Sequence, residues 1–167
     1  PFTFRSLDVG VIHDLMIHDI DLVLSLDPGR LERVEARGIV AAGGFEDAVR
    51  ARLVFASGLI ADLTASRISP AARRTVSLWS ADAMVHCDLT AKTVEVVSPS
   101  ESVRSGGFSA AAVPAAERTA MKDRFFTDIL PLETLTVADA NAIAGEHDDL
   151  LAAIREGRPP LPDRGEQ

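Results

Sequence analysis

The sequence has a single cysteine, Cys87, and therefore no internal disulfide framework. No apolar run approaches the roughly 20 residues of a membrane-spanning helix, and the first residues follow no signal-peptide pattern. These absences favour a reducing compartment, and we expect a cytoplasmic protein outside the membrane. Basic residues are also few: 17 Lys and Arg stand against 25 Asp and Glu, and the net charge of −8 argues against binding to nucleic acid or to an anionic membrane surface.

Nucleotide-binding motifs are missing as well. No Gly-x-Gly-x-x-Gly follows a strand-like segment, and there is no phosphate-binding loop. The sequence therefore shows no cofactor site of its own, and it contains no internal repeat. Its content of 47% hydrophobic and 25% charged residues over 167 positions is typical of one globular domain with a proper core. We accordingly expect residues 1–167 to form a single domain.

Hydrophobic periodicity predicts a helix followed by a series of strands. Residues 8–26 are apolar nearly all round a helix, which is typical of burial in a core. Asp8 is the expected N-cap of this helix, and Asp27-Pro28-Gly29 is expected to end it. From residue 34 the helical period gives way to strict alternation. Strands are expected at residues 34–42, 47–55, 59–66, 74–80, 84–89 and 93–97.

Short polar breaks separate these strands and therefore predict an antiparallel meander. Residues 98–119, rich in Ser, Ala and Gly, predict a mobile loop, residues 125–137 one more extended segment, and residues 140–156 a second helix that Asp139 and Gly157 cap. This order predicts an α+β domain: an open, mostly antiparallel sheet of about six or more strands, with helices packed on one face. Because a large apolar sheet face is rarely left in water, we also expect self-association through the sheet.

The first helix carries a stripe of titratable side chains. Asp14, His18 and Asp21 are spaced i, i+4, i+7 and, at about 100° per residue, fall within about 60° of one another. Gly10 lies one turn earlier on nearly the same line, and its lack of a side chain would leave room for a ligand. An imidazole oriented by a carboxylate one turn away is a general acid/base unit, so Asp14 and His18 are candidate catalytic residues.

Other interpretations of these polar residues stay open. Because burying charged groups is costly unless they are paired, Asp14 and His18 could form a closed buried pair, with Asp21 bonded to a backbone amide. The three could also hold a metal ion, although one helix face rarely supplies three ligands. Arg67, at the end of a strand, and Arg73 could meet an anionic group on a ligand, or could be ordinary exposed arginines.

The run Asp14-x-x-x-His18-Asp-x-Asp21, after Gly10-Val-Ile, resembles the opening helix of the C-terminal domain of the Gfo/Idh/MocA oxidoreductases. The likeness covers nearly all of the chain. It continues through Glu46-Asp47, Phe55-Ala-Ser-Gly58, Leu63-Thr-Ala-Ser-Arg67 and Ala153-Ile-Arg-Glu-Gly-Arg-Pro-Pro.

The resemblance implies a two-domain enzyme. An N-terminal Rossmann domain would bind NAD or NADP, and this C-terminal domain would bind the substrate and build dimers or tetramers. His18 would remove a hydroxyl proton while hydride leaves for the nicotinamide, Asp14 would orient His18 or bond the substrate, and Asp21 would be a structural anchor. The family's active-site lysine lies in a Glu-Lys-Pro motif of the cofactor domain, which is absent from these 167 residues. The chain is therefore expected to be part of a longer protein and to be inactive alone.

The segment Leu7-Asp-Val, together with Thr64-Ala-Ser-Arg67, resembles the corresponding sequence of the branch that oxidises the 3-hydroxyl of UDP-N-acetylglucosamine-type nucleotide sugars. This branch implies a sugar or nucleotide-sugar substrate, with Gly10, Arg67 and Arg73 near it and the two arginines facing the diphosphate. A second hypothesis, from another class of protein, is a non-catalytic oligomerisation or ligand-binding module with the same fold. The retained Asp14–His18 pair favours the enzyme.

Overall fold

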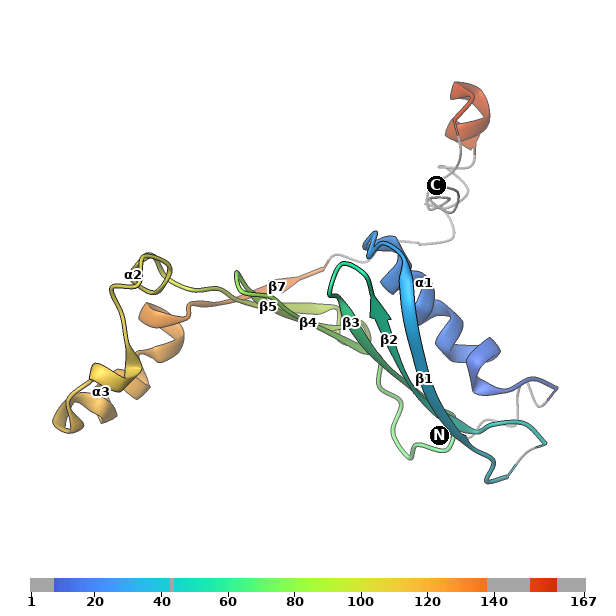
Figure 1. Ribbon diagram of the computed structural model, residues 1–167, viewed down its shortest axis with the longest axis horizontal. Helices are drawn as coiled ribbons and strands as arrows, with labels where there is room; N and C mark the ends of the chain where they lie inside the picture. The colour runs from blue at the N-terminus through green and yellow to red at the C-terminus, as the bar shows by residue number, and fades with distance from the viewer. Residues whose placement is uncertain (1–7, 43, 138–150, 159–167) are drawn as a thin grey trace. The chain divides into compact units, whose positions relative to one another are not determined.

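The computed structural model describes residues 8–42, 44–137 and 151–158 (Figure 1). The chain divides into two compact units: unit 1 comprises Pro1–Ala72 and Ala142–Gln167, and unit 2 comprises Arg73–Asn141. The seven described strands pair antiparallel, three in a sheet in unit 1 and four in a sheet in unit 2. The α+β class and the antiparallel pairing are thus confirmed, while the hydrogen-bonded strands form two sheets rather than one continuous meander.

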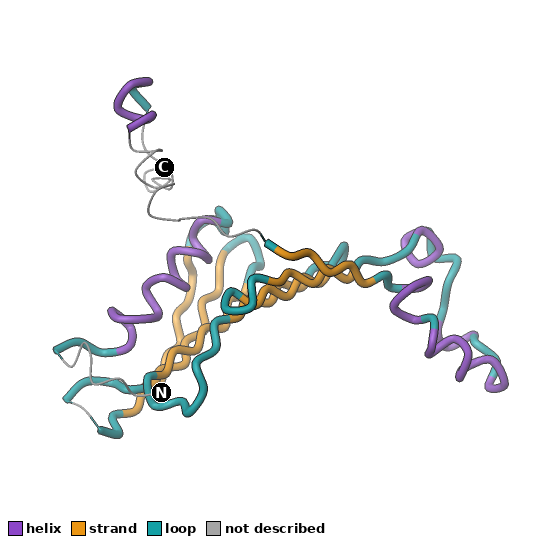
Figure 2. The backbone as a smooth tube through the Cα atoms, turned by 180° about the vertical axis from the view of Figure 1, so that it is seen from behind, coloured by secondary structure: helices purple, strands orange, loops and turns teal. Residues whose placement is uncertain are grey.

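Unit 1 begins with a helix that packs on its sheet. A wide π turn, η1 (Ile12–Met16), leads into α1 (Ile17–Ser25), and the sheet follows in the order β1 (Leu31–Ile39), β2 (Ala48–Phe55) and β3 (Ile60–Ser66). Figures 1 and 2 show the helix running along one face of these strands. The helix ends where the sequence predicts, because the backbone turns to positive φ at Asp27 and Gly29 on either side of Pro28.

The core of unit 1 lies between this helix and the strands β2 and β3. Alternate residues of both strands point to the helix and are buried: Val49, Ala51, Leu53, Phe55, Ala61, Leu63 and Ala65. The helix contributes Val11 and Met16, which are also buried. The intervening residues of the strands face away from the helix, and most of them carry charged or polar side chains, including Arg50, Arg52 and Asp62. The alternation read from the sequence is therefore the pattern of a half-covered sheet.

The described part of unit 2 has a sheet but no comparable core. Its strands are β4 (Thr75–Trp79), β5 (Met84–Asp88), β6 (Thr93–Val97) and β7 (Leu132–Thr136), in that order. No residue of these strands is fully buried, and no described helix packs extensively on them. The register gathers mostly apolar side chains on one face, which we call the apolar face: Val76, Leu78, Val85, Cys87, Val94, Val96 and Leu135. Glu133, opposite Val96, also lies on this face.

The segment between β6 and β7 departs from the predicted loop. It forms α2 (Glu101–Arg104), α3 (Arg118–Asp123), two 3-10 turns, η2 (Ala110–Ala112) and η3 (Ala115–Glu117), and a π turn, η4 (Phe125–Ile129). The prediction of an irregular segment over residues 98–119 is wrong in this respect, because elements of a single turn are too short to leave a hydrophobic period. Likewise, only the second half of residues 125–137 is extended, as β7.

The predicted C-terminal helix is described at residues 151–156, where the chain is helical. Gly157 follows with a positive φ of 66°, as expected of a C-cap, and the amide of Arg158 donates to the carbonyl of Ala153. The first part of the predicted helix, with its cap Asp139, lies outside the described residues. No helix in the described ranges is long and apolar enough to cross a membrane.

Candidate functional site

The titratable stripe lies on the accessible side of the first helix. His18 and Asp21 are exposed, and Asp14 is half-buried. Its composition predicts that the helix is buried nearly all round, but this prediction is wrong, because only one side of the helix meets the sheet. The other side leaves apolar residues exposed: Leu15, Ile17, Leu22, Leu24 and Leu26.

Asp14 and His18 do not form the closed buried pair that the sequence left open. No hydrogen bond or ion pair within the described residues involves the side chain of Asp14, His18 or Asp21. An exposed imidazole also needs no compensating partner, because water solvates it. The metal alternative finds no support either, since no group of three or more His, Cys, Asp and Glu in the described ranges is arranged to hold an ion.

The helix is irregular at Asp14. The amide of Ile17 donates to the carbonyl of Ile12, five residues back, so that Asp14 sits in the middle of a π turn. A π turn holds more residues than an α turn, and the i, i+4 spacing therefore does not stack Asp14 on His18 as a regular helix would. Isolated π turns within α-helices are frequent at functional sites. This irregularity, which the sequence does not reveal, marks the stretch as a candidate site.

Gly10 is explained by a contact within the chain. A Cβ atom at position 10 would overlap the side-chain carboxylate of Glu46, which fills that space. The same Glu46 holds the start of the helix: its carbonyl accepts from the amide of Val11 at 3.0 Å, and its Oε1 accepts from the amide of Ile12 at 3.3 Å. The prediction that Asp8 caps the helix is therefore wrong. The free amides at the start of the helix donate instead to Glu46, in the β1–β2 connection. Whether Gly10 also contacts a substrate stays a prediction.

Arg67 is a nearly buried arginine rather than an exposed one. Its side chain is 10% exposed, and its Nε lies 3.5 Å from Oδ1 of Asp47, whose side chain is 1% exposed. Its Nη2 donates to the carbonyl of Val9 at 2.6 Å and to that of Glu46 at 3.3 Å. Arg67 therefore connects the end of β3 with the segment that enters the helix. The predicted contact with a diphosphate is untested, but a guanidinium held in this way has little freedom to reach a ligand.

Asp47 completes this arrangement. Its Oδ2 accepts from the amides of Ala41 and Ala42, both at 2.7 Å, and its own amide donates to the carbonyl of Ile39. The carboxylate thus orders the connection between β1 and β2. Sequence reasoning missed Glu46 and Asp47 as functional candidates. The signal in the sequence was the acidic pair Glu46-Asp47 immediately before β2. It stands with Arg67, which immediately follows β3, the strand that pairs with β2.

Arg73 and Arg67 belong to different units of the chain. Arg73 is exposed and belongs to unit 2, whereas Arg67 belongs to unit 1.

Unit 2 has polar interactions on the face of its sheet opposite the apolar face. A half-buried histidine, His86, bonds through Nδ1 to Oγ of Ser77 at 2.8 Å. Asp88, on the same face, has its carboxyl pKa lowered by hydrogen bonds from the backbone amides of Ala91 and Thr90.

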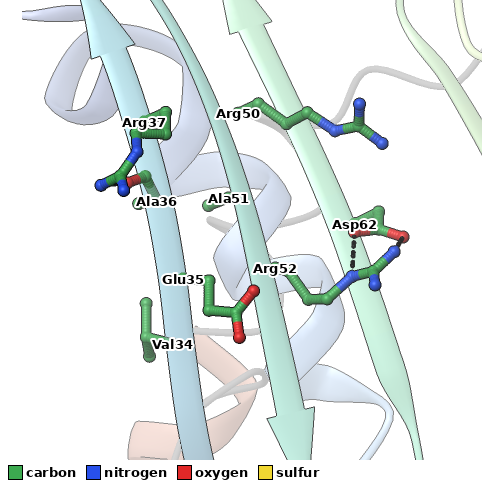
Figure 3. A pocket seen from close by; sticks show the side chains of 8 residues that line it. All are labelled: Val34, Glu35, Ala36, Arg37, Arg50, Ala51, Arg52 and Asp62. Carbon is green, nitrogen blue, oxygen red and sulfur yellow. Dashed lines mark hydrogen bonds and ion pairs between the residues drawn. The ribbon is translucent and has the colours of Figure 1, made fainter.

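The uncovered face of the unit 1 sheet is charged. Figure 3 shows Glu35, Arg37, Arg50 and Arg52 projecting from neighbouring strands over a shallow hollow. Nε and Nη2 of Arg52 each donate to one carboxylate oxygen of Asp62 at 2.7 Å, and this forked bond lowers the pKa of Asp62. Arg37 and Arg50 stand opposite each other in the strand register. Such a face is well solvated and does not itself require a covering partner.

The described residues do not fit a dinucleotide cofactor. The connections between described strands are hairpins, residues 67–74 between β3 and β4, and the helical segment between β6 and β7; none is a glycine-rich turn leading from a strand into a long helix. The sheets are antiparallel, without the carboxyl-end crevice of a parallel sheet. A nicotinamide cofactor would therefore have to be held chiefly by residues other than the described ones.

Comparison with known proteins identifies relatives of the chain. Residues 2–88, more than half of it, match the family described as the GFO/IDH/MocA C-terminal domain. UDP-N-acetylglucosamine 3-dehydrogenase from Acidithiobacillus ferrooxidans is 30% identical over 159 residues, which are 95% of this chain and 44% of that protein. The solved structure of this enzyme, GnnA, matches with a TM-score of 0.75 and 29% identity over 96% of this chain and 45% of that chain.

More distant structures share the fold. A super-repressor mutant of Gal80p from Saccharomyces cerevisiae matches with a TM-score of 0.61 over 99% of this chain and 43% of that chain. At 9% identity this likeness concerns the fold alone. The chain thus spans less than half the length of the relatives that it matches.

Proposed function

The chain belongs to the GFO/IDH/MocA family through its C-terminal domain, and on this premise we propose that it is the substrate-binding half of an NAD(P)-dependent dehydrogenase. Its substrate is a sugar or nucleotide sugar whose hydroxyl group is oxidised, or whose keto group is reduced. The observation that carries the proposal is the half-buried Asp14 in the π turn η1, followed by the exposed His18 in the first turn of α1. No hydrogen bond or ion pair within the described residues uses either side chain, which leaves both available to a ligand.

His18 is the proposed acid/base. In the oxidation direction a ring nitrogen of His18 takes the proton of the substrate hydroxyl, and in the reverse direction it returns that proton to the carbonyl oxygen. Asp14, half-buried four residues earlier, either accepts a hydrogen bond from the imidazole or bonds a neighbouring substrate hydroxyl. The exposure of His18 leaves its imidazole free to meet a ligand. NAD or NADP is the hydride partner and is bound by the remainder of the longer protein.

A nucleotide sugar of the UDP-N-acetylglucosamine type is the favoured substrate. The support is the 30% identity with a UDP-N-acetylglucosamine 3-dehydrogenase across 95% of the chain, together with the fold match to that enzyme. Gly10 and Arg73 stay candidate substrate neighbours. With the reacting hydroxyl against His18, as proposed, the rest of the nucleotide sugar would extend across the same helix surface.

Self-association through a sheet is part of the proposal. The apolar face of unit 2 places seven apolar side chains on one side of a sheet that no described helix covers extensively. A second copy of the chain, presenting the same face, would remove these side chains from water in a dimer, and two such dimers would make a tetramer. The charged face of unit 1 does not offer an equivalent apolar surface.

A non-catalytic ligand-binding or oligomerisation module is the second candidate function. A specific observation keeps it in consideration: the fold alone is shared with a repressor, the Gal80p mutant. Fold therefore does not decide between catalysis and binding, and the site has to. The alternative predicts that the full-length protein binds a ligand but does not turn it over.

The deciding experiment measures nicotinamide reduction by the full-length protein with UDP-N-acetylglucosamine and either NAD or NADP. We expect His18→Ala to cut turnover by about 10²–10⁴-fold without loss of folding, because the side chain is exposed. His13→Ala is the matched control, since His13 is also exposed and lies in η1. Equal activity of both variants, or no activity of the unaltered protein, would contradict the proposal.

A further inference from the structure

Three residues hold the start of the helix that carries Asp14 and His18. We call Glu46, Asp47 and Arg67 the helix clamp. We propose that the helix clamp positions Asp14 and His18 for the reaction, so that Arg67 and Glu46 act through the helix and not by touching the substrate. For the catalytic consequence, the inference rests on the proposed function. The placement of the helix itself is open to a separate test.

The first step of the clamp joins Arg67 to Asp47. The backbone amide of Arg67 donates to the carbonyl of Asp47 at 2.9 Å, and the side chains approach between Nε and Oδ1 at 3.5 Å. Both side chains are almost fully withdrawn from water. Removing either charge would leave the other buried, so the two residues keep each other in place. This contact fixes the end of β3 against the start of β2.

The second step passes from Arg67 to the helix. Nη2 of Arg67 donates to the carbonyl of Val9 at 2.6 Å and to the carbonyl of Glu46 at 3.3 Å. Val9 immediately precedes Gly10, whose own carbonyl accepts from the amide of Asp14 at 3.1 Å. The carbonyl that accepts from Arg67 and the carbonyl that accepts from the amide of Asp14 therefore belong to consecutive peptide units.

The third step is the contact of Glu46 with the first helical amides. Val11 and Ile12 donate to the carbonyl and to Oε1 of Glu46, respectively. A carboxylate at a helix start also interacts favourably with the positive end of the helix dipole. Gly10 permits this approach, because a side chain there would overlap the carboxylate. The start of the helix is thus set from the β1–β2 connection, 34 residues away in sequence.

The clamp matters for catalysis because Asp14 lies in the turn that it holds. A displacement of about 1 Å, caused by a change far from the reacting atoms, can cost about 10²-fold in rate. A clamp residue that acts in this way lowers kcat, whereas a residue that binds the substrate's diphosphate mainly raises KM. The two roles of Arg67, clamp and diphosphate contact, are therefore separable by kinetics.

The test compares Glu46→Ala with Glu46→Gln in the full-length protein. Gln keeps a side-chain oxygen that can accept from the amide of Ile12, and Ala does not. We expect Glu46→Ala to speed hydrogen exchange at the amide of Ile12 about tenfold, and Glu46→Gln to leave it nearly unchanged. The amides of Leu53 and Leu63 in the core strands serve as internal controls and should not change. Unaltered exchange at Ile12 in Glu46→Ala would overturn the inference.

Kinetics of the same variants supply the second readout. With UDP-N-acetylglucosamine as substrate, we expect Glu46→Ala and Arg67→Lys to lower kcat by about 10- to 10²-fold with little change in KM. Glu46→Gln should keep kcat close to that of the unaltered protein. A raised KM with unchanged kcat in Arg67→Lys would overturn the inference in favour of a direct diphosphate contact. If the unaltered protein turns over no substrate while Ile12 exchange responds as expected, the proposed function fails and the positioning of the helix stands.

Discussion

The two units of this chain use similar strands in opposite ways. In unit 1 a helix lies on β2 and β3, and their inward residues, such as Phe55 and Leu63, are buried. In unit 2 four strands pair just as regularly, yet none of their residues is buried, and the segment between β6 and β7 forms only short helical turns. Strand pairing by itself therefore does not make a core. A sheet needs a second layer, and only unit 1 supplies one among the described residues.

This difference suits the two proposed tasks. A catalytic helix has to be held rigidly, and unit 1 holds it by a packed core and by the helix clamp. An association surface needs apolar side chains left over after folding, and the apolar face of unit 2 provides them. Four measurements, from the largest expected effect to the smallest, would break or sharpen this comparison.

Core truncation should affect unit 1 far more than unit 2. Phe55 is 2% exposed, and we expect Phe55→Ala to lower the free energy of unfolding by about 3–5 kcal/mol, through lost burial and the cavity that it leaves. Val96 on the apolar face is only half-buried, so Val96→Ala should cost less than about 1.5 kcal/mol. Urea unfolding of the 167-residue chain measures both. Equal losses would show that Val96 is buried by something other than the residues of unit 2.

The buried ion pair should contribute more than an exposed one. Asp47→Asn removes a charge that is nearly inaccessible to water, and we expect a loss of about 1–3 kcal/mol in the free energy of unfolding. Its counterpart in unit 2 is the exposed i, i+4 pair of Arg124 and Asp128, where Asp128→Asn should leave the unfolding midpoint unchanged because water screens the pair. A midpoint that falls as far for Asp128→Asn would refute the contrast.

Charge on the apolar face should weaken self-association. We expect Val85→Lys in the full-length protein to shift the sedimentation distribution towards monomer, because the ammonium would be desolvated in the contact and the residues opposite Val85 in the register, Leu78 and Val96, are apolar. Thr134→Lys is the matched control: it adds the same charge on the opposite face of the same sheet, where Thr134 stands opposite Glu95. Dissociation by both variants, or by neither, would argue against this face as the contact.

The smallest effect is a titration difference between two carboxyl groups. The forked bond from Arg52 lowers the pKa of Asp62 in unit 1, and backbone amides of Ala91 and Thr90 lower the pKa of Asp88 in unit 2. Both depressed pKa values make a contribution to stability that is present above the ordinary carboxyl pKa and is lost as the pH falls through the folded pKa.

Salt separates the two causes. We expect added salt to raise the pKa of Asp62 towards its ordinary value, because ions screen the exposed pair with Arg52, and to change that of Asp88 less, because fixed amide donors remain in place. Titration followed by nuclear magnetic resonance of the carboxyl carbons checks this. A larger salt response at Asp88 would count against the assigned causes.

Much of this chain follows from local patterns. The alternation of residues 47–55 and 59–66, the turn at Gly58 and the stop after Leu26 all appear in the structure close to where the sequence predicts them. Such features depend on residues a few positions apart, whose periodicity decides which side chains share a face. Asp14 and His18 were also singled out from local spacing, but the π turn changes how the two residues lie relative to each other.

Features that depend on distant contacts could not be predicted in this way. The cap of the helix comes from Glu46 and not from Asp8, and the carbonyl of Val9 is held by Arg67, 58 residues along the chain. Composition suggested a helix buried on nearly all sides, but the number of layers around the helix decides burial, and the described residues supply one. By itself the sequence determined the strands, the turns and the candidate acid/base pair, because periodicity acts locally. Only the tertiary structure decided the two sheets, the π turn and the helix clamp, because each depends on which side chains meet after the strands have paired.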